Sequence, residues 1–129
     1  MNSQEKTDFS RYGKSFQEGL AALILQDRAF CDQIQEVLET EYFELKYLQV
    51  FVDRVFSYKD KYNVHPSTKI FTTILRTELD DETDAVKKQT RDYYARIYNS
   101  EIKDCDFVKN TSLDFCRKQV LKGAMMQSI

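Results

Sequence analysis

The sequence predicts an all-helical protein with a small head of about four helices and a C-terminal antiparallel helical hairpin. Apolar residues recur every three or four positions through most of the chain, which is the period of a helix and not the alternation of a strand. Only three glycines and one proline occur in 129 residues, too few for the many tight turns of an all-β fold. With 42% apolar and 31% charged residues, the composition is that of one globular domain.

We divide the chain into three segments that belong to this one domain. Residues 1–12 are polar and form a flexible N-terminal tail, with Phe9 as an anchor on the body. Residues 13–80 form the helical head, and residues 81–129 form the helical hairpin.

The first helix of the head covers SFQEGLAALILQD, where Phe16, Leu20 and Ile24 share one face. Ser15 and Glu18 have the spacing of a capping box, which predicts Ser15 as the N-cap. A glycine follows at position 19, where it costs about 1 kcal/mol relative to alanine. It is either tolerated as a poor helix former or needed for the close approach of another helix.

The second helix covers RAFCDQIQEVLE, with Asp27 as its candidate N-cap. The EYF motif that follows breaks the helical period. We expect Tyr42 and Phe43 to insert into the core where the chain turns. The inner face of this helix comprises Phe30, Ile34, Val37 and Leu38.

The third helix, from about Leu45 to Tyr62, carries the strongest helical pattern in the chain and is expected to form the axis of the head. The only proline, Pro66, follows in NVHPS and disfavours helical geometry at the preceding residue. Ser67 or Thr68 then caps a fourth helix that extends to about Leu79.

Two longer amphipathic helices end the chain. The first spans about 82–102 and is capped at Asp81, and the second spans about 107–129. A short polar link between consecutive helices is typical of an antiparallel hairpin. Such a hairpin leaves apolar surface for another subunit to cover, and tyrosine is enriched in such interfaces. The predicted subunit interface comprises Tyr94, Ile97, Tyr98, Leu113, Val120, Leu121 and Met125.

Motifs for catalysis are absent, so we expect this chain alone not to be an enzyme and to hold no catalytic, cofactor or metal site. It has neither a GxxxxGK[ST] phosphate loop nor a GxSxG motif. The single histidine, His65, is expected to bond to backbone or solvent, and the acidic residues 80–84 lack the pattern of a calcium loop. The three cysteines form no CxxC pair and are expected to be reduced, with two packed in helices.

The charge does not favour a dedicated nucleic-acid binder, because the net charge is −2 and the pI about 5.5. Lys109, Arg117, Lys118 and Lys122 on the last helix remain candidate nucleic-acid contacts. The alternative is a solvated face with ion pairs four residues apart. No apolar run approaches the ~20 residues of a membrane span, and the polar N-terminus lacks a secretory signal, so a cytoplasmic protein is expected.

The order of motifs resembles a known family. SFQEGLAALILQDRAFCDQI, then EYF, then the aromatic helix ending in KYNVHPS, a short helix, and finally FVKNTSLDFCRKQVLKGAM is similar to the N-terminal domain of DnaB-like replicative DNA helicases. The similarity is greatest to the divergent versions found in phages, which would place the protein in the cytoplasm of a bacterial host. It covers the chain from about Phe16 onward and depends on the pattern and order of motifs.

The resemblance implies a domain that assembles and does no chemistry itself. In that family the hairpins pair between subunits, and a ring of domains, a trimer of dimers, lies above the motor ring and binds a primase or a loader. ATP, magnesium and DNA would then be handled by a RecA-like motor domain that is absent from this chain, in a parent ATP-dependent DNA helicase. The alternatives are the helicase-binding domain of a DnaG-type primase, which has the same fold, and a stand-alone helical adaptor.

Overall fold

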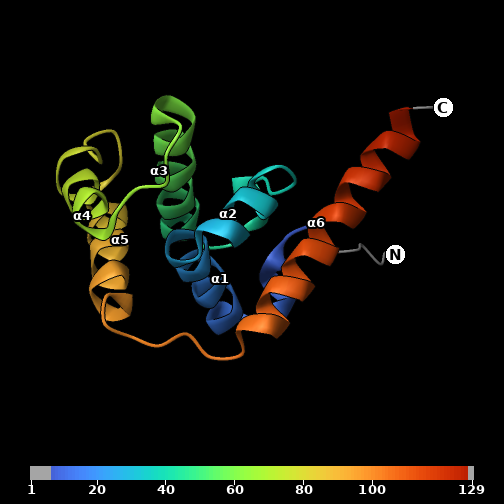
Figure 1. Cartoon of the computed structure of the whole chain (residues 1–129), viewed down its shortest axis with the longest axis horizontal. Helices are drawn as coiled ribbons and strands as arrows, with labels where there is room; N and C mark the ends of the chain where they lie inside the picture. The colour runs from blue at the N-terminus through green and yellow to red at the C-terminus, as the bar shows by residue number, and fades with distance from the viewer. Residues whose placement is uncertain (1–6, 128–129) are drawn as a thin grey trace.

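The computed structural model describes residues 7–127 of the chain, with side chains through residue 124, and this part is all-helical (Figure 1). Its two 3-10 helices and six α-helices are η1 (Phe9–Tyr12), α1 (Lys14–Gln26), α2 (Arg28–Gln35), η2 (Thr40–Tyr42), α3 (Lys46–Tyr62), α4 (Thr68–Thr77), α5 (Asp84–Ile97) and α6 (Cys105–Gln127). None of the helices in the described residues is both long and apolar enough to cross a bilayer.

Helix α3 forms the axis of the molecule, as its strong apolar period predicts. It packs on α1 along one side and on α5 along the other. The ring of Phe51 lies 4.9 Å from the ring of Phe71 on α4 and 5.0 Å from that of Tyr93 on α5, both edge-on. Val52 and Val55 on the same helix are fully buried. One aromatic cluster on α3 therefore holds α4 and α5 in place.

The N-terminal segment is more ordered than a flexible tail of twelve residues. Residues 9–12 form η1, and Phe9 is fully buried. Its ring lies 5.3 Å from that of Phe43 and 4.8 Å from that of Phe115, so it joins η1 to the chain after η2 and to α6. The anchor predicted at Phe9 is confirmed, while residues 1–6 of the predicted tail lie outside the described part of the chain.

Two of the predicted helix caps are confirmed and two are wrong. The Asp27 carboxylate accepts a hydrogen bond from the Phe30 amide, and the Ser67 hydroxyl accepts one from Ile70. At α1 the N-cap is Gly13 instead of Ser15, because the Glu18 carboxylate of the expected capping box bonds elsewhere. At α5 the cap is Thr83 instead of Asp81, because the Asp81 carboxylate pairs with Arg54.

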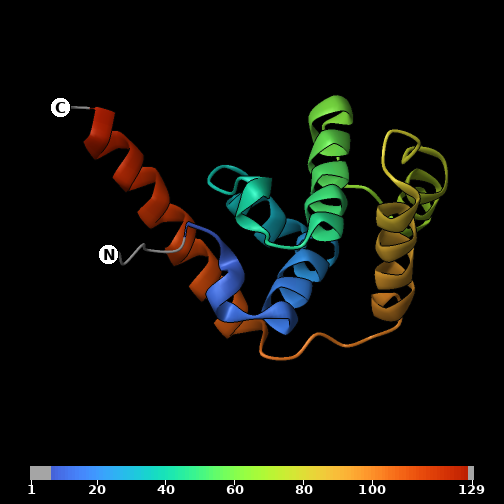
Figure 2. The same cartoon turned by 180° about the vertical axis from the view of Figure 1, so that it is seen from behind.

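The structure does not show the expected antiparallel packing of the last two helices. Helix α5 ends at Ile97, five residues earlier than predicted, and packs on α3, while α6 packs on α1 and α2. Figures 1 and 2 show α5 and α6 on opposite sides of α1. Residues 98–104 connect them in a loop that begins with a turn at 98–99 and ends with Asp104 in the left-handed region. The apolar face of α5 is therefore covered by α3 and α4, not by α6.

Candidate interaction surface

Helix α6 has an inner half, residues 105–116, that is packed on the body. Val108, Leu113 and Cys116 are buried there, as is Phe115, whose ring lies 5.4 Å from that of Tyr42. The helix starts after Asp104, a residue in the left-handed region with φ 56°, whose carbonyl accepts the Val108 amide. This sharp entry turns the chain from the 98–104 segment into α6.

Lys109 fixes the inner half of α6 to the start of α2. Its ammonium lies 2.6 Å from the Asp27 carboxylate and 5.9 Å from the centre of the Phe30 ring. The hydrogen bond from Lys109 holds the pKa of Asp27 below its ordinary value, and the same bond raises the pKa of Lys109. Asp27 also caps α2, so this one carboxylate joins the two helices. Lys109 is therefore engaged within the fold and is poorly placed to contact nucleic acid.

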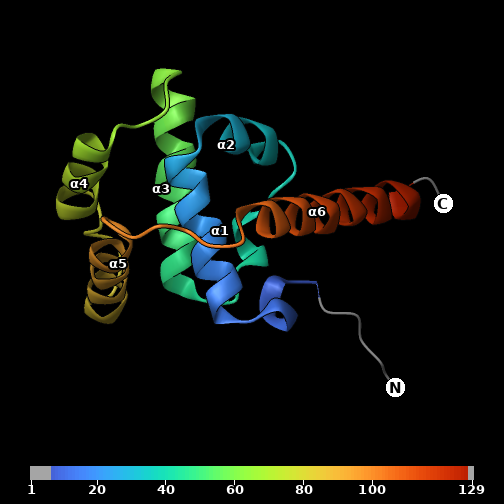
Figure 3. The ribbon, with the colours of Figure 1, turned by 60° about the horizontal axis from the view of Figure 1, so that its bottom comes forward.

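The outer half of α6, from residue 117 onward, projects away from the body (Figure 3). Two of its apolar side chains are largely exposed, Val120 by 51% and Leu121 by 60%. Short isolated helices are marginally stable in water, and their stability in proteins comes from packing of an apolar face. The outer half of α6 therefore presents apolar surface that a partner could cover.

The seven predicted interface residues do not form one surface. Tyr94 and Leu113 are buried, and the Tyr94 hydroxyl bonds to the Thr68 carbonyl on α4. Ile97 is partly buried against the core. Tyr98 is 48% exposed at the end of α5, with its ring 5.6 Å from that of Tyr94. Val120 and Leu121 are exposed on the outer half of α6, and the Met125 side chain lies outside the described residues.

The other predicted nucleic-acid contacts lie on the outer half of α6. Arg117 and Lys118 are exposed, and the Lys118 ammonium is 3.0 Å from the Asp114 carboxylate four residues before it. Lys122 is partly buried and also engages another group. The Lys118 pair is of the kind that the solvated-face alternative predicts.

Sequence reasoning missed Phe107, an aromatic residue that is 61% exposed in the first turn of α6. Its neighbour Val108 is buried. The sequence pattern carries no clear signal for this exposure, because adjacent residues further along the same helix, Phe115 and Cys116, are both buried.

The histidine, the cysteines and the acidic residues are the side chains in this sequence that could bind a metal ion. Within the described residues, no three His, Cys, Asp or Glu side chains gather where they could hold a metal ion. The His65 imidazole bonds through Nε2 to the carbonyl oxygen of Leu25, near the C-terminus of α1, as expected for a loop histidine. Cys31 and Cys116 are buried, and burial raises the pKa of each thiol to about 12. These two thiols therefore act as packing groups.

No model of a known protein family matches the chain, and searches of curated proteins and of solved structures found no similar protein. Function must therefore be inferred from the residues and their placement.

Proposed function

We propose that this chain is the N-terminal oligomerisation and partner-docking domain of a ring-shaped replicative DNA helicase, acting in DNA replication. The order of sequence motifs supports the family, and the packed helical head with a projecting helix supports an assembly role. In this proposal the domain holds neighbouring ATP-driven motor domains in a ring around DNA and presents a surface to a primase or loader. The chain itself contributes no chemistry, and DNA contact occurs through the parent ring.

The observation that carries this proposal is the outer half of α6, with Val120 and Leu121 exposed. Full burial of such a side chain contributes about 1.5–3 kcal/mol, so the two together can stabilise an interface substantially. The predicted head-plus-hairpin arrangement is modified accordingly. The projecting element is α6 alone, and the surface that covers its outer half belongs to a second copy.

Sedimentation of the purified chain at micromolar concentration tests the proposal. We expect the wild type to self-associate and Leu121→Asp to be monomeric, because an exposed leucine contributes nothing to the monomer fold but is buried on assembly. Asn110→Asp, an exposed substitution on the inner half of the same helix, is the matched control and should assemble like the wild type.

A monomeric wild type that nevertheless binds a replicative helicase ring in a pull-down would favour the alternative, the helicase-binding domain of a primase. In that case the outer half of α6 would dock on the helicase and not on a second copy. A monomeric wild type that binds neither would contradict both assignments.

A further inference from the structure

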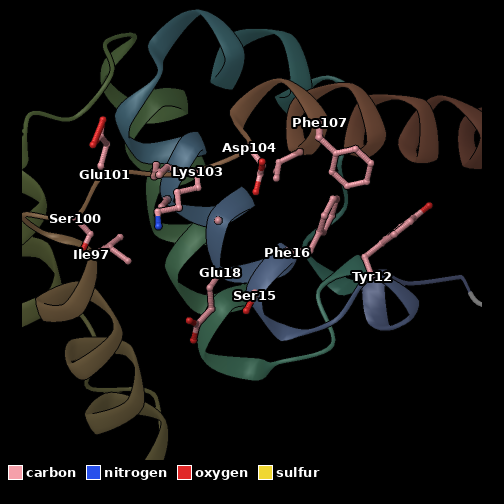
Figure 4. Close-up of a pocket in the computed structure, with 14 residues that line it drawn as sticks. Tyr12, Ser15, Phe16, Glu18, Ile97, Ser100, Glu101, Lys103, Asp104 and Phe107 are labelled. Atoms are coloured by element: carbon pink, nitrogen blue, oxygen red, sulfur yellow. The ribbon is translucent and has the colours of Figure 1, made fainter.

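A pocket of about 460 Å³ lies between α1 and the segment that leads from α5 into α6 (Figure 4). Its size is within the ~300–1,000 Å³ range of ligand pockets in proteins. One wall is aromatic, because the Phe16 ring lies 4.7 Å from that of Tyr12 and 6.2 Å from that of Phe107. Gly19 and Ala22 of α1 line it as well, together with Ile102 of the connecting segment.

The pocket leaves apolar surface in contact with solvent. Phe107 lies on its rim and is more than half exposed. A Cβ placed on Gly19 would meet nothing closer than the Ile102 Cγ2 at 4.0 Å, so a side chain could extend from this position. Gly19 is therefore not needed for close helix packing, and it leaves space beside α1 unfilled. Apolar surface of this kind marks binding sites in soluble proteins.

Carboxylates outnumber ammonium groups around the pocket. Glu101 and Asp104 lie along the connecting segment with Lys103 between them, as Figure 4 shows. The third carboxylate, Glu18, is neutralised by a bidentate hydrogen bond from Arg96. The occupant that fits best is therefore apolar and carries basic residues beside its apolar ones.

The outer half of α6 has this composition. Residues 117–127 read RKQVLKGAMMQ, with three basic residues and no acidic one, and Val120 and Leu121 are exposed in their midst. The helix cannot fill the pocket of its own chain. It starts at the pocket rim and leads away from it, so Leu121 lies about 21 Å beyond Phe107 at 1.5 Å per residue.

We propose that the outer half of α6 from a second copy docks in this pocket. Val120 and Leu121 would contact the aromatic wall, and Arg117 and Lys118 would face Glu101 and Asp104. This inference depends on the self-association proposed above, and it identifies the surface that the outer half of α6 contacts on the second copy. We call the outer half of α6 the donor helix and the pocket beside α1 the acceptor pocket. Because these are two different surfaces of one molecule, the contact between copies is head-to-tail and can propagate until a ring closes.

Two variants isolate the two surfaces. Gly19→Leu fills the pocket while removing an unfavourable glycine from α1, so the variant should fold at least as stably as the wild type. Gly19→Ala is its matched control, since it gains the same helix propensity with only one added carbon. Leu121→Asp disables the donor helix. We expect Gly19→Leu and Leu121→Asp each to weaken association by about tenfold or more, and Gly19→Ala to leave it unchanged.

Mixing the two variants tests the head-to-tail geometry in sedimentation equilibrium. Leu121→Asp retains an intact pocket and Gly19→Leu retains an intact donor helix. The mixture should therefore form one-to-one dimers although each variant alone is monomeric. A mixture that stays monomeric overturns the head-to-tail contact, and a Gly19→Leu variant that assembles normally overturns the pocket. Either result is compatible with the proposed self-association. A monomeric wild type would instead contradict both the self-association and the docking in the pocket.

Discussion

Glu18 joins three helices through a single carboxylate. It accepts a bidentate hydrogen bond from Arg96 of α5, at 2.9 and 3.0 Å, and a further one from the Tyr47 hydroxyl of α3. Burial raises the pKa of the Glu18 carboxyl, but the bonds from Arg96 and Tyr47 outweigh it and hold the pKa below its ordinary value of 4.5. Burial and the bond to Glu18 raise the pKa of Tyr47 to about 12. Both groups are therefore fixed in one protonation state near neutral pH.

Glu18→Gln should lower the free energy of unfolding by about 1 kcal/mol at pH 7, because the variant loses the ion pair with the half-exposed Arg96 but keeps an oxygen that accepts hydrogen bonds. A carboxyl whose pKa is lower in the folded state contributes stability above its unfolded value, near 4.5, and loses it as pH falls through the folded pKa. The difference between wild type and variant should therefore shrink below pH 4.5 in urea unfolding. Glu41→Gln, on the surface, is the control. A difference independent of pH would contradict the ion-pair explanation.

The sequence predicts a side chain's hydrogen-bond partner correctly where that partner lies a few residues away in the chain. Asp27 and Ser67 cap helices by accepting from an amide three residues later, and that spacing is visible in the sequence. Glu18 has a capping-box spacing too, yet its partners Arg96 and Tyr47 lie 78 and 29 residues away. The buried Gln17 likewise bonds to Glu44, 27 residues away. Local spacing carries no information about such partners.

At the scale of the helix, periodicity predicts that a face is buried but not which helix covers it. The pattern located both ends of α3 to within one residue, because that helix has a clear apolar stripe, and it placed the start of α6 to within two residues. The pattern does not indicate that α5 packs on α3. Adjacency in the sequence instead favours α6 as the packing partner of α5. The connection 98–104 is long enough that consecutive helices need not be neighbours, and the predicted helix 82–102 included its first part.

The two halves of α6 should differ in local stability. Amides of residues 109–116 are protected by a helix packed on the body, whereas residues 117–124 include the exposed Val120 and Leu121, so this half opens at a smaller cost in buried apolar surface. In hydrogen exchange of the monomeric Leu121→Asp variant, the outer amides should exchange much faster than the inner ones. Gly123→Ala in this background should slow the outer amides, because nothing lies within 4 Å of the added carbon and alanine favours the helix by about 1 kcal/mol. Uniform protection along α6 would contradict this division.

At the scale of the whole molecule, the described chain is one packed body with one projecting helix half. The aromatic cluster around Phe51 joins α3 to α4 and α5, and the cluster around Phe9 joins η1 to Phe43 and to the inner half of α6. The predicted boundary at residue 80 therefore does not separate two packing units, since α5 is part of the body. Under the proposed assembly role, the boundary between the folded body and the contact surface lies within α6, near residue 117.

This boundary predicts opposite outcomes for the same chemical change at two positions. Val55→Asp places a carboxylate in the fully buried face of α3 without a partner, which costs several kcal/mol and should abolish the helical circular dichroism of a domain this small. Leu121→Asp places the same group on an exposed face, so the spectrum and the thermal midpoint should stay close to the wild type while sedimentation shows the loss of assembly.

If both substitutions unfold the protein, the outer half of α6 is part of the folded body. If Leu121→Asp is folded and still assembles, the contact between copies lies on another surface, and the exposed Tyr62 and Ile70 at the junction of α3 and α4 become the next positions to change.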